Sequence, residues 1–111
     1  MDSDKASALF GSATRTRVLM AIALLKETYV SQLAAILDLT QPAVFKIVDD
    51  LERDAVIVSR YVGRTRTVAI NPRMYGAAEL ESFLTKYAKG TNVEKSVATV
   101  RKRPRRRKKE L

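Results

Sequence analysis

The chain has 111 residues, of which 46% are hydrophobic, and this suits one globular domain with a single core. It contains no cysteine and no histidine. Their absence removes disulfides, thiolate metal sites and the commonest general base. We therefore expect a protein that is not an enzyme and that binds no metal and no other cofactor.

The positive charge is concentrated near the C-terminal end. The formal net charge is +9, yet residues 1–100 carry 13 Lys and Arg against 11 Asp and Glu, a net of +2. Residues 101–109 carry 8 Lys and Arg. Such a basic segment predicts a polyanionic partner, either nucleic acid or an acidic membrane surface. The N-terminal residues do not resemble a secretory signal, and the apolar stretch Val18–Leu25 is too short to span a bilayer, so we expect a cytoplasmic protein with no membrane partner.

The first half of the chain predicts four helices. A short helix is expected after Ser3, ending at Gly11, and a second over about residues 12–25, apolar on nearly all sides and therefore central. We expect a polar connection at residues 26–29. Ser31 is expected to cap a third helix over residues 32–37, and Asp38 to begin a tight turn. Thr40 is expected to cap a fourth helix over about residues 41–54.

In the second half of the chain, the spacing of the apolar residues changes from a helical period to one typical of β-strands. Residues 56–70 contain two β-rich runs around Val62-Gly63-Arg64-Thr65, which predicts a β-hairpin with a basic tip. A fifth helix is expected over residues 77–89, and a short sixth is suggested by valines spaced between residues 93 and 100. We assign residues 1–90 to the folded domain with its flanking helices. Residues 91–111 are expected to form a short helix or linker and a basic tail.

Two helices joined by a three-residue turn and followed by a hairpin predict a winged helix-turn-helix, a mainly α fold with a small β-hairpin. The major groove of B-DNA admits one α-helix, and the hairpin can reach an adjacent groove or the backbone. The partner expected from this pattern is double-stranded DNA. The candidate contacts in the fourth helix are Thr40, Gln41, Pro42, Ala43, Phe45 and Lys46. Those in the hairpin are Arg60, Arg64, Thr65 and Arg66.

Several side chains allow two interpretations. Phe45, on a face expected to be exposed, either folds back onto the core or hairpin or contacts a thymine methyl group. Arg15 and Arg17 either reach phosphate or pair with acidic side chains. The acidic residues between 49 and 54 would be repelled by phosphate and are expected at the end of the helix that points away from DNA.

The run VSQLAAILDLTQPAVFKIVDDLERDAVI at residues 30–57, with ALFGSATRTRVL at 8–19, resembles the core of ArsR-like winged-helix regulators. The resemblance covers roughly residues 6–70, and MarR-like regulators share much of the pattern. It implies the fold and DNA binding. Asp38 and Ala55 stand where glycine is usual, and residues 28–33 replace the cysteine-bearing metal box. These departures, with no histidine in the final helix, argue against metal sensing.

Two apolar stripes remain outside the predicted winged core, one near the start of the chain and one in the fifth predicted helix. In the resembled family the terminal helices form a dimer interface, which implies a homodimer; the alternative is that both stripes complete a monomeric core. The candidate interface residues are Leu9, Phe10, Leu80, Phe83, Leu84 and Tyr87.

The basic tail is interpreted as a non-specific DNA arm, the alternatives being a solvated end or a nuclear-import signal. Its candidate contacts are Arg101, Lys102, Arg103, Arg105, Arg106, Arg107, Lys108 and Lys109.

The sequence as a whole predicts a nucleoid-associated transcriptional regulator, most simply a repressor, that binds an inverted repeat as a homodimer. The alternatives are an architectural or partition protein with little sequence preference and, less favoured, a protein-interaction module. No small-molecule effector can be identified from the sequence.

Overall fold

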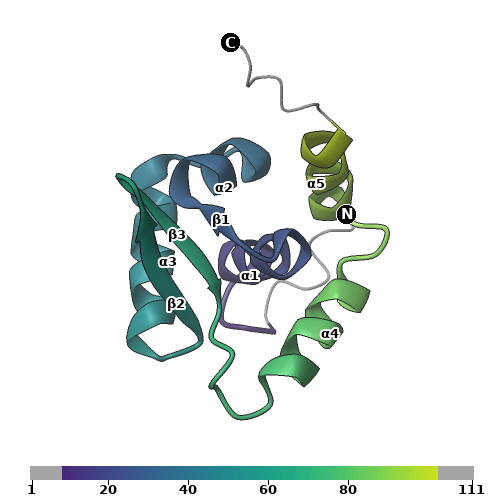
Figure 1. Cartoon of the computed structure of the whole chain (residues 1–111). Coiled ribbons are helices and arrows are strands. Elements are labelled where there is room, and N and C mark those ends of the chain that lie inside the picture. The colour runs from purple at the N-terminus through teal and green to yellow at the C-terminus, as the bar shows by residue number, and fades with distance from the viewer. Residues whose placement is uncertain (1–8, 103–111) are drawn as a thin grey trace.

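The computed structural model describes residues 9–102, and its central element is helix α1 (Ala13–Leu25) (Figure 1). The helix begins near the expected residue, just after Ser12, whose side chain accepts a hydrogen bond from the backbone N–H of Arg15. Every residue from Val18 to Leu24 is buried. α1 contacts all four other helices of the described chain as well as the sheet, so it forms the centre of the core.

Helices α2 (Val30–Leu37) and α3 (Gln41–Arg53) are joined by residues 38–40. Asp38 has the left-handed backbone expected of it, with φ of 58°. Thr40 caps α3 as predicted, because its Oγ1 accepts a hydrogen bond from the N–H of Ala43. The prediction that Ser31 caps α2 was wrong. The helix starts one residue before Ser31, after an extended Tyr29 that makes no side-chain capping bond.

A three-stranded antiparallel sheet lies beside these helices. It comprises β1 (Thr28–Tyr29), β2 (Ile57–Val62) and β3 (Thr65–Ile70), in the order β1-β3-β2. The hairpin between β2 and β3 was predicted, but residues 28 and 29 were expected to be a connection. They instead pair with β3, with Thr28 opposite Val68. The described chain is thus mostly helical, with a small antiparallel sheet.

Helices α4 (Ala77–Tyr87) and α5 (Asn92–Lys102) cover the other side of α1 (Figure 1). Leu84 of α4 is completely buried, and Val93 and Val97 of α5 are almost so. α5 packs against both α1 and α2. The valine spacing that suggested a short final helix therefore reflects core packing. Of the short helix expected before Gly11, only Leu9 and Phe10 are described, and they lie in a turn.

The end of α3 forces alanine into a conformation that suits glycine. Ala55 has φ of 64°, and its N–H donates to the carbonyl of Glu52 while the N–H of Val56 donates to that of Leu51. This hydrogen-bond pair is the Schellman arrangement, which places its left-handed residue just beyond the helix. It reverses the chain into β2.

We expect Ala55→Gly to raise the free energy of unfolding by about 0.5–1 kcal/mol, since glycine adopts positive φ without the steric penalty of a Cβ. The matched control is Ala35→Gly at an exposed position inside α2, which should lower the same quantity by about 1 kcal/mol. Urea unfolding of the three chains measures both. A less stable Ala55→Gly chain would show that the backbone is not strained there.

Candidate functional site

The N-terminal half of α3 is an exposed surface. Val44, Val48 and Leu51 anchor the helix in the core, and Ile47 packs partly against it, as the helical spacing predicted. The residues of α3 that were predicted to contact DNA therefore face outward. All six are exposed, namely Thr40, Gln41, Pro42, Ala43, Phe45 and Lys46.

Two side chains on this surface carry polar groups without internal partners. Among residues 9–102, neither the amide of Gln41 nor the ammonium group of Lys46 makes a hydrogen bond or an ion pair with another described residue. As far as the described residues are concerned, both groups are available to an external ligand. Thr40 differs, because its hydroxyl is occupied in capping the helix.

Arg66 of β3 connects the hairpin to α3. Its Nε donates to Ser59 Oγ at 3.0 Å, and its Nη2 contacts Asp49 Oδ1 at 3.3 Å and the carboxylate of Glu52. Only 20% of the Arg66 side chain is exposed. Partial burial acts to lower the pKa of Arg66, but the hydrogen bonds to Glu52 and Asp49 outweigh it, so that this pKa is raised. The side chain is therefore a charged structural link.

Phe45 lies next to this link. The guanidinium carbon of Arg66 is 6.0 Å from the centroid of the Phe45 ring, within the range of a cation–π contact. The ring nevertheless remains 43% exposed. Of the two interpretations of Phe45, the contact with the hairpin is present, and it leaves much of the ring accessible.

Arg60, also predicted to contact DNA, is held on the opposite face of the sheet. Its Nε and Nη2 donate to the carboxylate of Glu27 at 2.9 and 3.2 Å, and Thr67 Oγ1 donates to the same carboxylate at 2.8 Å. The hydrogen bond from Arg60, and then that from Thr67, lowers the pKa of Glu27 from its ordinary value of 4.5. The same hydrogen bond raises the pKa of Arg60.

The hairpin tip carries the remaining hairpin candidates. Gly63, with φ of 64°, and Arg64 form the two-residue loop, and Thr65 follows opposite Val62. Arg64 and Thr65 are exposed, and Arg64 makes no ion pair within residues 9–102. β2 runs back alongside α3, and Arg66 contacts Phe45 and Asp49. The tip, which is two residues before Arg66 in the sequence, therefore lies toward the N-terminal half of α3 (Figure 1).

Each acidic side chain at the C-terminal end of α3 is paired with an arginine, which the sequence did not reveal. Asp49 and Glu52 bind Arg66 as described, and Asp50 Oδ1 accepts from Arg53 at 3.0 Å. The fourth pair is Arg15 with Asp54, at 3.3 Å. Of the two interpretations of Arg15, pairing with an acid is therefore the one observed. Arg17 differs, since its Nε is buried without a hydrogen-bond partner.

The predicted dimer residues divide between core and surface. Leu84 is completely buried and offers no surface to a partner, which corrects its assignment to an interface. Leu80, Phe10 and Tyr87 pack partly against the core. Phe83 remains 43% exposed and Leu9 50%.

The rings at this surface form a cluster. Phe83 stacks on Tyr87 with centroids 5.1 Å apart and meets Phe10 edge to face at 6.4 Å. We call Leu9, Phe10, Phe83 and Tyr87 the aromatic surface.

The predicted tail contacts cannot be placed. Arg101 and Lys102 end α5, and their side chains are not described; the other six lie outside the described residues, namely Arg103, Arg105, Arg106, Arg107, Lys108 and Lys109.

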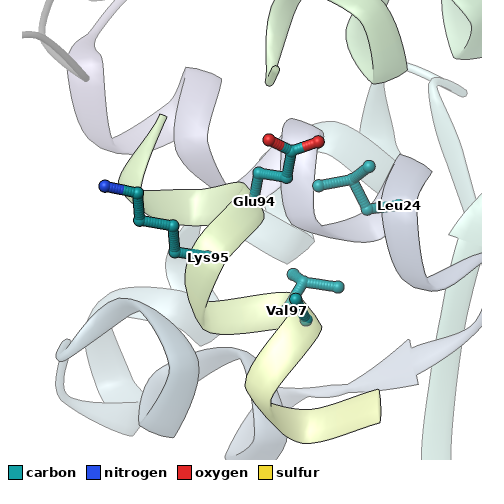
Figure 2. Close-up of a pocket in the computed structure, with 5 residues that line it drawn as sticks. Leu24, Glu94, Lys95 and Val97 are labelled. Atoms are coloured by element: carbon teal, nitrogen blue, oxygen red, sulfur yellow. The ribbon is translucent and has the colours of Figure 1, made fainter. Parts of the chain in front are cut away.

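A pocket of about 270 Å³ lies between α1 and α5, lined by Leu24, Glu94, Lys95 and Val97 (Figure 2). Its acidic group has a structural role, because Glu94 Oε1 accepts from the N–H of Gly90 at 2.8 Å, just before α5. Within residues 9–102, His, Cys, Asp and Glu form no group of three or more that could hold a metal ion. In the same range no helix is both long and apolar enough to cross a membrane.

The pairing of Glu27 predicts an acid-sensitive contribution to stability. Because its pKa is lowered on folding, this contribution is complete above the ordinary value of 4.5 and is lost as pH falls through the folded-state pKa. We expect Glu27→Gln to lower the melting temperature at neutral pH, with a gap from wild type that closes on acidification. Glu79→Gln, at an exposed carboxylate without a described ion pair, is the control and should leave a smaller gap, because its carboxylate interacts only with the first turn of α4. A Glu27→Gln gap that stays constant through the acid range would contradict the pairing.

The described residues thus place a half-exposed helix beside a hairpin that Arg66 holds against it. A separate aromatic surface includes α4 and the residues before α1. No family model, curated protein or solved structure matches this chain.

Proposed function

We propose that the chain is a winged helix-turn-helix protein that binds double-stranded DNA and regulates transcription. α3 would enter the major groove, which is about 12 Å wide and admits one helix, while α2 crosses the backbone. The observation that carries the proposal is the exposed N-terminal half of α3, where the side chains of Gln41 and Lys46 make no hydrogen bond or ion pair within residues 9–102. A solvent-facing helix half with available donors is the chemistry that base reading requires.

Each available group has a distinct role in this proposal. The amide of Gln41 matches the paired donor and acceptor of adenine in the major groove, and the ammonium group of Lys46 suits guanine or a phosphate. Arg64 at the hairpin tip would contact phosphate or the minor groove. Arg60 and Arg66, which are committed to acidic side chains, would instead hold the hairpin in position.

The aromatic surface supports a homodimer. Among the described residues, Phe83 and Leu9 expose large apolar side chains, and a two-fold partner would cover both copies of such a patch. Two copies of α3 would then face successive major grooves about one helical turn apart. We expect the binding site to be an inverted repeat. A nucleoid location follows from this proposal.

A second candidate is an architectural protein with little sequence preference. It is favoured by the commitment of Arg60 and Arg66 to acids, together with the 8 Lys and Arg of residues 101–109, because charge in a tail gives affinity without specificity. Selection from random oligonucleotides separates the candidates. The regulator should return a short inverted repeat, and the architectural protein no motif.

We expect Gln41→Ala to weaken binding to the selected site by about 1–3 kcal/mol, and binding to random DNA by less, because an amide that reads a base contributes only at its own sequence. Lys89→Ala, at an exposed lysine beyond α4, is the control and should change neither. Titrations by fluorescence anisotropy at one salt concentration measure the affinities. Equal losses for Gln41→Ala on both DNAs would contradict base reading.

We expect Phe83→Glu to give a folded monomer with much weaker DNA binding, because a carboxylate in a covered apolar surface would be desolvated without a partner. Thr99→Glu, at an exposed position on α5, should remain dimeric. Sedimentation at micromolar concentration, free and with DNA, measures the assembly. A wild-type chain that is monomeric in both conditions would remove the dimer from the proposal.

A further inference from the structure

The ring of Phe45 is the most exposed large apolar group on α3. It lies four residues after Gln41, so the two side chains share one stripe on the outward face of the helix. Burial elsewhere would have been the ordinary outcome for a phenylalanine. Its place beside the available groups of Gln41 and Lys46 suggests a ligand that offers both polar and apolar groups.

The structure restricts how this ring can move. Arg66 lies 6.0 Å from the ring centroid and is itself held by Ser59, Asp49 and Glu52. A guanidinium with three acceptors is fixed in place, so one side of the ring has a fixed neighbour. This neighbour limits the conformations of the Phe45 ring before any ligand arrives, which reduces the entropy lost on binding.

The charges around the ring favour DNA over an apolar protein partner. Arg66 pairs with both Asp49 and Glu52 and offsets one of their two negative charges, while Lys46 and Arg64 stay unpaired within residues 9–102. The resulting surface is an apolar ring among available cations. The major groove combines phosphates with one apolar group on the base edges, the C5 methyl of thymine.

We infer that Phe45 reads the C5 methyl group of thymine in the major groove, and that Arg66 is the residue that positions its ring. This inference rests on the DNA-binding function proposed above. The four-residue step from Gln41 to Phe45 is a rise of about 6 Å along the helix. Since base pairs are spaced about 3.4 Å apart, Gln41 and Phe45 contact base pairs within about two steps of each other, and the binding site contains A·T pairs at that spacing.

The test replaces thymine by uracil, one position at a time, in the duplex selected from random oligonucleotides. This change removes the methyl group and leaves base pairing intact. Wild-type affinity should fall about fourfold at one position in each half-site, the value of one buried carbon. Phe45→Ala should bind thymine and uracil duplexes equally, and Phe45→Leu should retain part of the preference. Tyr75→Ala, at a fully exposed aromatic outside α3, is the control and should keep the full preference.

The positioning role of Arg66 has its own readout. Arg66→Met should weaken binding to all DNA, because Asp49 and Glu52 lose their partner, and it should also reduce the thymine preference. Adding Asp49→Asn and Glu52→Gln to Arg66→Met should restore affinity without restoring the preference. Circular dichroism of each chain checks that it is folded. A full preference in the triple variant would show that Arg66 does not position the ring.

The outcomes separate this inference from the function on which it rests. If the chain selects a motif but binds its thymine and uracil forms equally at every position, the methyl contact is overturned and DNA binding stands. The same holds if Phe45→Ala keeps the preference. If Phe45→Ala dissociates the dimer instead, the ring is a protein contact and the inference falls. If no duplex binds, both the function and the inference fail.

Discussion

The guanidinium of Arg66, bound between Asp49 and Glu52, is the interaction on which the arrangement of the hairpin depends. A hairpin that follows a helix through a tight reversal at Ala55 could adopt a range of angles. Burial of Ile57, Val68 and Ile70 in the core limits these angles, and Arg66 adds a polar link, because its Nε also binds Ser59 on the neighbouring strand and so connects both strands to α3. On the other face, Glu27 holds Arg60 and Thr67. The hairpin is therefore held from both sides by charged hydrogen bonds that are stronger than neutral ones.

These pairs also determine which charges remain available. Residues 1–100 have a net charge of only +2, so composition alone gives this part of the chain little preference for an anion. Pairing changes the distribution, because the acids of α3 are each bound to an arginine near its C-terminal end. The unpaired polar groups of α3 then gather at its N-terminal half, with Arg64 nearby. A nearly neutral domain can in this way present a local surface suited to phosphate.

Local signals in the sequence predicted most of the helices, and interactions distant in sequence explain what it missed. The cap at Thr40, the start of α1 near Ser12 and the apolar spacing of α3 depend on residues within one helical turn and were predicted correctly. β1 has two residues, too few for a period, and exists only because β3 pairs with it. The partners of Arg66 were likewise unpredictable, since they depend on the register of the hairpin against α3. The spacing of the apolar residues around Leu84 predicted an apolar stripe on this helix. It did not show which side of the stripe would face α1.

Helix α1 links the two surfaces on which the proposal depends. It contacts α4, which carries Phe83 and Tyr87 of the aromatic surface, and it also contacts α3. α1 has no glycine or proline between Ala13 and Leu25, and its middle is buried on all sides, so it has little freedom to bend. In a two-fold dimer built through Phe83, the distance between the two copies of α3 would therefore be set by packing against α1. A rigid distance of this kind is what recognition of an inverted repeat at fixed spacing requires.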